Sequence, residues 1–181
     1  MAIGQSRVDT TAVSSAFFHL ETARLQLSPV QVADAAEMSR VLSDPALYTF
    51  TGGAPETEVE LATRYTRWVA GATQPGQTWV NLIARERTTG HAIGYVQATV
   101  NPDIADIAWV IGTPWQRKGY AVEAARALVA HVTDSFHVAT IRALIKAEHV
   151  ASQRIAERLG MRLTDDVVRG EQVWIRKARG D

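Results

Sequence analysis

The segment WQRKGYAV, residues 115–122, places two cations and a glycine between an apolar stretch and an amphipathic one. A helix that begins just after Gly119 leaves several backbone N–H groups without intrahelical acceptors, and its dipole favours negative charge there. Such a helix end binds phosphate readily, and Gln116, Arg117 and Lys118 can add further donors. An ordinary strand–helix junction also carries a glycine and some charges, so the segment alone leaves both interpretations open.

Other kinds of chemistry find little support in the sequence. The chain has no cysteine, which excludes disulfides, thiolate metal ligands and a cysteine nucleophile. Its five histidines lack the spacing of a metal site, so no metal is predicted. The serines lack the elbow motif of a hydrolase nucleophile, and the glycine patterns of Walker and dinucleotide-binding loops are absent.

The overall composition is that of one globular domain. The chain has 181 residues, 46% of them hydrophobic, and equal numbers of acidic and basic residues give zero net charge. Zero net charge argues against a nucleic-acid partner. No run of about 18 apolar residues occurs, so no membrane partner is predicted, and the lack of cysteine suits a cytoplasmic protein. Residues 1–16 predict a flexible tail, and residues 17–181 predict a single domain.

Hydrophobic periodicity predicts an α/β fold with a mixed sheet. Thr57 and Glu60 form a capping box, and Gly160 stands where a helix commonly ends. The predicted strands are residues 23–27, 78–85, 92–100, 104–111, 140–146, 161–163 and 173–175. Helices are expected up to Leu42, after Thr57, from about Tyr120, and over 150–159. This order predicts a central sheet of about six to seven strands with about four helices on both faces.

Several segments also occur in an order and spacing that resemble a known family. They are ADIAWVIGTPW, QRKGYA, VEAARALVAHV, TIRALIKAE and HVASQRIAERLGM. Together they resemble the GNAT superfamily of acetyl-CoA-dependent N-acetyltransferases, in which a Gln/Arg-x-x-Gly-x-Gly/Ala pattern follows the fourth strand. Gln116, Gly119 and Ala121 match that pattern position by position. The opening LETARLQLSPV is similar to the start of the ribosomal-protein and small-amine branch, so the resemblance covers about residues 17–178.

The resemblance implies a sheet splayed between its fourth and fifth strands and a site for acetyl-CoA. Val110 and Ile111 would offer backbone groups to the pantetheine and the thioester. His149 stands where the family often has asparagine, and it would make a polar contact with the pantetheine. Ser152 matches a family serine, and it would cap the next helix or contact the coenzyme. The residues expected to hold the pyrophosphate are Gln116, Arg117, Lys118, Gly119, Tyr120 and Ala121.

Acetyl transfer to an amine needs a neutral amine and a polarised carbonyl group. An amine with a pKa of about 10 must lose a proton, and a carboxylate acting directly or through water is the usual acceptor. Asp106 interrupts an apolar strand and matches an acidic residue of many relatives, so it is the predicted base; an ordinary solvent-facing position is the alternative. The tyrosine that acts as an acid in some branches is replaced by Ala156, which leaves a water-relayed or substrate-assisted route open. Trp79 and Trp109 are predicted to wall the acceptor cleft, although tryptophans also pack in cores.

The prediction from sequence is an N-acetyltransferase that moves an acetyl group from acetyl-CoA to a primary amine. The acceptor is expected to be a small molecule or a protein N-terminus. Direct transfer in a ternary complex is expected because no cysteine can carry the acyl group. Two alternatives stay open, a non-catalytic CoA-binding regulatory module and an acyltransferase with a longer acyl donor. An apolar C-terminal strand and exposed strand ends are compatible with a homodimer.

Overall fold

A single mixed sheet forms the centre of the structure, a computed structural model that describes residues 18–178. The strands are β1 (Leu20–Glu21), β2 (Leu25–Pro29), β3 (Thr78–Glu86), β4 (Ala92–Val100), β5 (Ile104–Ile111), β6 (Thr140–Ile145), β7 (Arg162–Val168) and β8 (Glu171–Lys177). Their order in the sheet is β1-β2-β3-β4-β5-β6-β8-β7. Neighbouring strands are antiparallel except β5 and β6, which run parallel.

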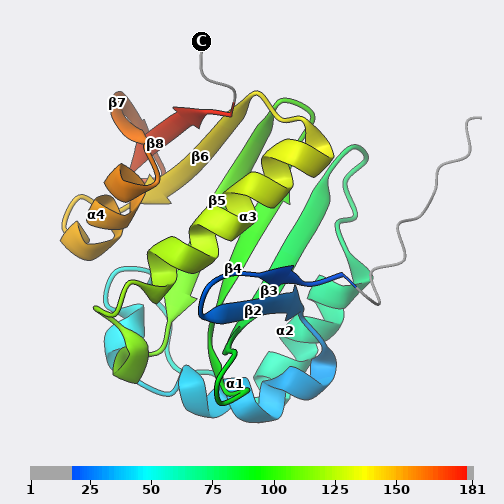
Figure 1. Cartoon of the computed structure of the whole chain (residues 1–181). Helices are drawn as coiled ribbons and strands as arrows, with labels where there is room; N and C mark the ends of the chain where they lie inside the picture. The colour runs from blue at the N-terminus through cyan, green and yellow to red at the C-terminus, as the bar shows by residue number, and fades with distance from the viewer. Residues whose placement is uncertain (1–17, 179–181) are drawn as a thin grey trace, which may run out of the picture.

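Helices cover both faces of this sheet. They are α1 (Ala35–Val41), α2 (Glu58–Ala70), α3 (Tyr120–Phe136) and α4 (Val150–Arg158), with short 3₁₀ turns η1 (Val32–Asp34), η2 (Pro45–Tyr48) and η3 (Thr113–Trp115). Leu82 packs in a core with residues of α3, whereas the next residue, Ile83, packs in a second core with residues of α1 and α2. Successive strand residues point to opposite faces, so the two cores lie on opposite sides of the sheet. In Figure 1, α3 runs diagonally across the front of the sheet.

The long helix α3 owes its position to an apolar stripe. Leu128 and Val132 are fully buried, and Val122 and Val129 are less than a tenth exposed. These residues recur at the three- and four-residue spacing that places side chains on one helix face. Burying each such side chain contributes about 1.5–3 kcal/mol. The stripe therefore fixes which side of α3 faces the sheet and which side faces outward.

The strands β5 and β6 separate soon after they meet. Their parallel pairing covers Ile104–Asp106 on β5 and Thr140–Arg142 on β6. Beyond that point β5 stays paired with β4 as far as Ile111, and β6 stays paired with β8 as far as Ile145. Beyond residue 106, β5 remains paired only with β4 and β6 only with β8, so the sheet splays between β5 and β6. This is the splay expected between the fourth and fifth predicted strands.

The predicted order of elements is confirmed, with differences at both ends. The described sheet has eight strands instead of six to seven because the two residues of β1 pair with β2 as a short hairpin. The last two strands are longer than predicted, since polar residues such as Asp165 and Asp166 on the edge strand β7 hide its alternation. The predicted tail, residues 1–16, lies outside the described residues, and the domain limits and the homodimer stay predictions. None of the helices within 18–178 is long and apolar enough to span a bilayer.

Candidate functional site

A cavity opens where β5 and β6 separate. It has a volume of about 90 Å³ and lies between the two strands, the start of α4 and the chain that follows η2. Past Asp106, the side of β5 that faces β6 has no partner strand in the described sheet. Backbone N–H and C=O groups on such an edge need other partners, and amide groups of an extended ligand can supply them. The side chains that wall the cavity include Phe50, Ile107, Trp109, Ile145, His149 and Ser152.

The junction between β5 and α3 has the backbone conformation that an anion site requires. Arg117 (φ 61°) and Gly119 (φ 86°) are both left-handed and turn the chain into α3. Gly119 occupies the N-cap position, and no described side chain caps the helix. The N–H groups of Tyr120, Ala121 and Val122 have no hydrogen-bond acceptor among residues 18–178. The first turn of α3 therefore presents several unsatisfied donors and the positive end of the helix dipole.

Gln116 connects this junction to the splayed strand. Its Nε2 donates a hydrogen bond of 2.9 Å to the carbonyl oxygen of Ile111. The neighbouring Val110 packs against the core that contains α1 and α2. Gly94 on β4 lies against the same stretch, and a Cβ atom at this position would overlap the carbonyl oxygen of Val110. The end of β5 is therefore held between β4 and the junction. The side chain of Gln116 is bonded to the strand and fixes the junction to Ile111.

Side chains from the turn between β1 and β2 hold the junction in place. The Arg24 guanidinium lies 4.4 Å from the centre of the Tyr120 ring and donates to the Lys118 carbonyl at 3.0 Å. Arg24 also forms a salt bridge of 2.6 Å with Glu123 in the first turn of α3. Burial would raise the pKa of Glu123, but hydrogen bonds from Thr22 and Arg24 outweigh burial and hold this pKa below its ordinary value. Glu123 therefore stays ionised at neutral pH and keeps the turn attached to α3.

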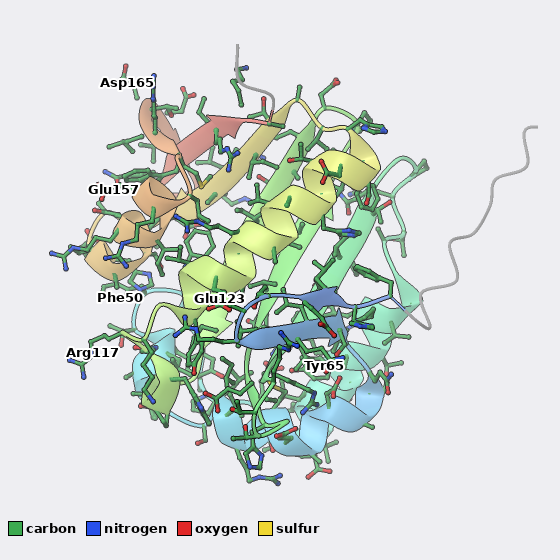
Figure 2. All side chains as sticks on the ribbon, viewed as in Figure 1. Phe50, Tyr65, Arg117, Glu123, Glu157 and Asp165 are labelled. Carbon is green, nitrogen blue, oxygen red and sulfur yellow. The ribbon has the colours of Figure 1, made fainter. Side chains whose placement is uncertain are left out.

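The remaining polar side chains of the junction point outward or are already engaged. Arg117 and Lys118 are exposed, and Figure 2 shows Arg117 projecting from the outer end of the loop. The hydroxyl of Tyr120 donates a 2.5 Å hydrogen bond to Glu86, and this bond raises the pKa of Tyr120. The backbone N–H of Tyr120 is thus free to donate to a ligand, whereas its hydroxyl group is bonded to Glu86.

His149 forms part of the cavity wall together with Phe50. The two rings stack with their centres 4.3 Å apart and an angle of 15° between them. The Oγ of Ser152, which is buried, lies 3.4 Å from Nε2 of His149, and no described side chain caps α4. Burial lowers the pKa of His149, so the ring is neutral near pH 7. A neutral imidazole beside a hydroxyl group offers one donor and one acceptor to a ligand in the cavity.

Asp106 lies at the point where β5 and β6 part, but it does not line the cavity. Its carboxylate accepts two hydrogen bonds from Arg142 on β6, at 2.5 Å and 2.9 Å. These bonds raise the pKa of Arg142 above its ordinary value. A bidentate guanidinium engages both oxygens of the carboxylate and holds them in the plane of the ion pair. The geometry thus favours a structural role over proton transfer, and the assignment of Asp106 as base stays a prediction.

The two tryptophans predicted for the acceptor cleft lie on opposite faces of the sheet. Trp109 lines the cavity and packs against the core that contains α3. Trp79 shares a face with Ile83, on the side of α1 and α2, and its Nε1 donates to Gln77 at 3.0 Å. Trp79 is not among the residues that line the cavity, so the structure brings only Trp109 to it.

Some contributors to the site could not be recognised in the sequence. Phe50 follows the short turn η2, and nothing near it in the sequence indicates an aromatic stack with His149, the residue before α4. Arg24 and Glu123 carry ordinary charges, and their salt bridge forms across 99 residues. Gly94 was the one detectable signal, because a glycine inside a strand often marks a close backbone approach. No cluster of metal-binding side chains occurs within residues 18–178.

The sequence matches one protein family over most of its length. The profile described as the acetyltransferase (GNAT) domain matches residues 24–162, more than half of the chain. No curated protein sequence is similar enough to count as a match.

Solved structures of similar fold support the same comparison. An acetyltransferase of the GNAT family from Bacillus anthracis has 17% sequence identity and a TM-score of 0.73, and the alignment covers 89% of this chain and 99% of that one. RimL, a ribosomal alpha-N-protein acetyltransferase in complex with coenzyme A, has 14% identity and a TM-score of 0.75, with 88% and 98% covered. An acetyltransferase from Agrobacterium tumefaciens has 22% identity and a TM-score of 0.72, with 96% and 99% covered. The TM-scores show that these proteins share the fold of this chain, and at identities this low the comparison shows the fold alone.

Proposed function

The chain belongs to the GNAT acetyltransferase family, and on this premise we propose that it transfers an acetyl group from acetyl-CoA to a primary amine. Enzymes of this family are acetyltransferases that use acetyl-CoA. The acceptor that we propose is a small molecule or a protein N-terminus; the protein substrate in the name of the similar RimL structure supports the second class. The observation that carries the proposal is the uncapped start of α3, joined through Gln116 to the splayed end of β5.

The residues of the junction fit the coenzyme. The N–H groups of Tyr120, Ala121 and Val122 would hold the pyrophosphate, with Gly119 allowing its close approach. Of the two residues predicted to serve the pantetheine, Ile111 would offer its backbone N–H at the free edge of β5, since its carbonyl oxygen accepts from Gln116. The carbonyl oxygen of Val110 lies against Gly94 of β4, so the backbone of Val110 faces into the sheet. The coenzyme supplies the acetyl group as a thioester, whose thiolate leaves readily because thiol pKa values lie near 8.5.

The shape of the cavity supports acetyl over a longer acyl group. Its volume is about 90 Å³, and the Phe50–His149 stack and Trp109 form part of its wall. A longer acyl chain would need further open apolar space, which a cavity of this volume does not offer. Acetyl-CoA is therefore the expected donor, and octanoyl-CoA is the probe that tests this step. Release of free thiol from octanoyl-CoA at the same rate as from acetyl-CoA would contradict it.

Calorimetric titration followed by an amine panel tests the proposed function. Acetyl-CoA should bind the protein without an acceptor, and release of free thiol should then depend on a primary amine. The panel should contain polyamines, amino acids, and peptides with a free N-terminus, because the sequence does not select among them. Coenzyme binding without amine-dependent thiol release would favour the non-catalytic module, and absence of coenzyme binding would refute the proposal.

The role of Asp106 needs a paired test, because its ion pair gives it a structural function in any case. Asp106→Asn and Arg142→Gln both break the bidentate pair, yet only the first removes a carboxylate. If Asp106 is the base, Asp106→Asn alone abolishes the acidic limb of the pH–rate profile while acetyl-CoA affinity is kept. Equal losses in the two variants, with unchanged pH profiles, would assign proton removal to water or to the substrate.

A further inference from the structure

A lysine side chain lines the cavity at the splay, and the proposed transfer to an external amine does not use it. Lys146 directly follows β6 and forms part of the cavity wall. It is half-buried, whereas Lys118 and Lys177, the other two lysines of the chain, are exposed. A lysine amine is a nucleophile once it has lost a proton, so an amine in the wall of a thioester site can react with the thioester.

The backbone of Lys146 is held in place while its side chain reaches toward the neighbouring hairpin. The N–H of His149 donates a hydrogen bond of 2.9 Å to the carbonyl oxygen of Lys146, which fixes the chain between β6 and α4. Its Nζ lies beside the turn between β7 and β8, because a Cβ atom added to Gly170 would stand 3.7 Å from it. The amine is therefore at the end of the sheet where β5 and β6 have separated.

Lys146 lies on the face of the sheet opposite α3. Ala143 and Ile145 of β6 pack in the core that contains α3. Successive strand residues point to opposite faces, so Leu144 points away from α3, and Lys146 continues its alternation. The proposed coenzyme site begins at the start of α3, so the thioester would enter the splay from that side. The amine of Lys146 thus approaches from the side that remains for an acceptor.

The amine of Lys146 is not tied to an acidic partner. Glu171 also lines the cavity, but no salt bridge joins Lys146 to it or to another acid within residues 18–178. A lysine carries its charge on a flexible four-carbon stem. The side chain can therefore turn toward a ligand in the cavity without breaking an ion pair.

We propose that Lys146 is a site of self-acetylation, at which the protein transfers the acetyl group of bound acetyl-CoA to its own chain. This inference rests on the proposed function, which brings the thioester to the cavity at the splay. The ammonium group of Lys146 first gives one proton to water. The neutral Nζ then attacks the carbonyl carbon of the thioester, so that an N–C bond forms and the C–S bond breaks. The nitrogen loses a second proton, which the leaving thiolate takes up, and the products are acetyl-lysine and coenzyme A.

Proximity distinguishes Lys146 from the other two lysines. A nucleophile held beside its electrophile reacts as though it were present at a very high concentration. Lys118 lies in the loop before α3, and Lys177 pairs with Thr140 at the opposite end of β6. Acetylation removes the positive charge of Lys146 and adds an acetyl group to the wall of a cavity of about 90 Å³. The modified protein should therefore acetylate external amines more slowly.

Peptide mass spectrometry tests the inference on the unmodified protein, incubated with acetyl-CoA and no added amine. Lys146 should gain an acetyl group roughly tenfold faster than Lys118 and Lys177, with a rate constant independent of protein concentration. Equal rates at the three lysines, or a rate constant that rises with protein concentration, would overturn self-acetylation within one chain. Acetyl phosphate, a donor that lacks the coenzyme, should show no preference for Lys146. The same preference with acetyl phosphate would assign it to the amine alone and overturn the inference.

The variant Lys146→Arg keeps the positive charge and removes the reactive amine. Without added amine, the unmodified protein should release a burst of thiol that stops once Lys146 is acetylated. Lys146→Arg should lose this burst and keep its calorimetric affinity for acetyl-CoA, whereas Lys177→Arg should keep both. A burst of equal size in Lys146→Arg would refute the assignment.

The same measurements separate this inference from the proposed function. If acetyl-CoA binds and continuous thiol release depends on an added amine while Lys146 stays unmodified, only the self-acetylation is overturned. If acetyl-CoA does not bind, the proposed function is overturned and this inference with it.

Discussion

The helices α2 and α3 begin in opposite ways. At the start of α2, the Thr57 side chain accepts a hydrogen bond from the Glu60 N–H, and the Glu60 carboxylate accepts one from the Thr57 N–H. At the start of α3, the N-cap residue is Gly119, which has no side chain to offer. The first helix satisfies its own end groups, whereas the second leaves them available to a ligand.

The start of α4 is intermediate in this comparison. His149 is its N-cap residue, and no described side chain caps the helix. His149 and Ser152 line the cavity at the splay. Orphaned N–H groups at a helix end are unfavourable unless a side chain, water or a ligand satisfies them. The start of α2 is closed by its own side chains and the start of α3 is open, whereas at α4 the N–H groups of Val150 and Ser152 donate to the carbonyl oxygens of Glu148 and His149.

The largest effect is expected from adding a side chain at the open end of α3. Gly119→Val places a β-branched residue at φ 86° and directs a Cβ to within 3.4 Å of the Arg24 guanidinium. The junction must then reorganise, and binding of coenzyme A should weaken roughly a hundredfold through loss of two or more charged hydrogen bonds. Calorimetric titration measures this loss.

Gly90→Val provides the matched control for this variant. Gly90 also has a positive φ, of 73°, in the turn between β3 and β4, where no atom lies within 4 Å of an added Cβ. It should show a similar backbone strain in thermal unfolding and an unchanged affinity for coenzyme A. Unchanged affinity in Gly119→Val would contradict an anion site at α3.

An intermediate effect, on stability alone, is expected at the closed end of α2. Thr57→Ala removes the capping side chain and should lower the free energy of unfolding by about 1 kcal/mol. Thr63→Ala, within the same helix, removes a hydroxyl group that bonds only to the Val59 carbonyl and should change stability much less. Urea unfolding measures both variants. A weaker affinity for coenzyme A in Thr57→Ala would remove the distinction between the two helix ends.

A smaller effect is expected from the exposed cation beside Gly119. Arg117→Ala should weaken binding of coenzyme A roughly twofold to fivefold, since exposed ion pairs contribute about 0.2–1 kcal/mol. The same variant should reduce the dependence of binding on salt concentration. If Arg117→Ala weakens binding more than Gly119→Val does, the cations hold the pyrophosphate and the backbone amides are secondary.

The smallest effect is a dependence of stability on pH at the start of α4. Burial depresses the pKa of His149 below the ordinary value of 6.5, so its contribution is present above that value and is lost as pH falls through the lower folded-state pKa. Urea midpoints should therefore decline on acidification from about pH 7 to about pH 5, and less steeply in His149→Gln. Burial also lowers the pKa of His131 on α3, so His131→Gln should likewise make the decline less steep. An identical decline in His149→Gln and the unmodified protein would contradict the shift.

The sequence predicted those parts of the molecule that depend on neighbouring residues. The capping box at Thr57 and Glu60 needs only three residues of separation, and it forms as expected. The glycine before α3 indicated an uncapped helix start for the same local reason. Residues of the site that act at a distance were not predictable. Arg24 reaches Glu123 across 99 residues, and their charges are no different from those of other surface residues.

The role of Asp106 shows where reasoning from sequence stops. A carboxylate in an apolar strand indicates a special role, and proton transfer was one such role. Arg142 lies 36 residues further along the chain, and only the parallel pairing of β5 and β6 places it opposite Asp106. The same partial pairing creates the cavity, because the two strands separate just beyond this ion pair.

The sequence by itself determined the family, the order of helices and strands, and the open start of α3 in WQRKGYAV, residues 115–122. Periodicity, helix capping and glycine conformation act over a few residues, so they can be read along the chain. Tertiary structure alone decided where β5 leaves β6, that Phe50 stacks on His149, and that Arg126 of α3 donates to the carbonyl oxygen of Arg158 at the end of α4. These contacts join distant residues, and their geometry is set by how the whole sheet and its helices pack.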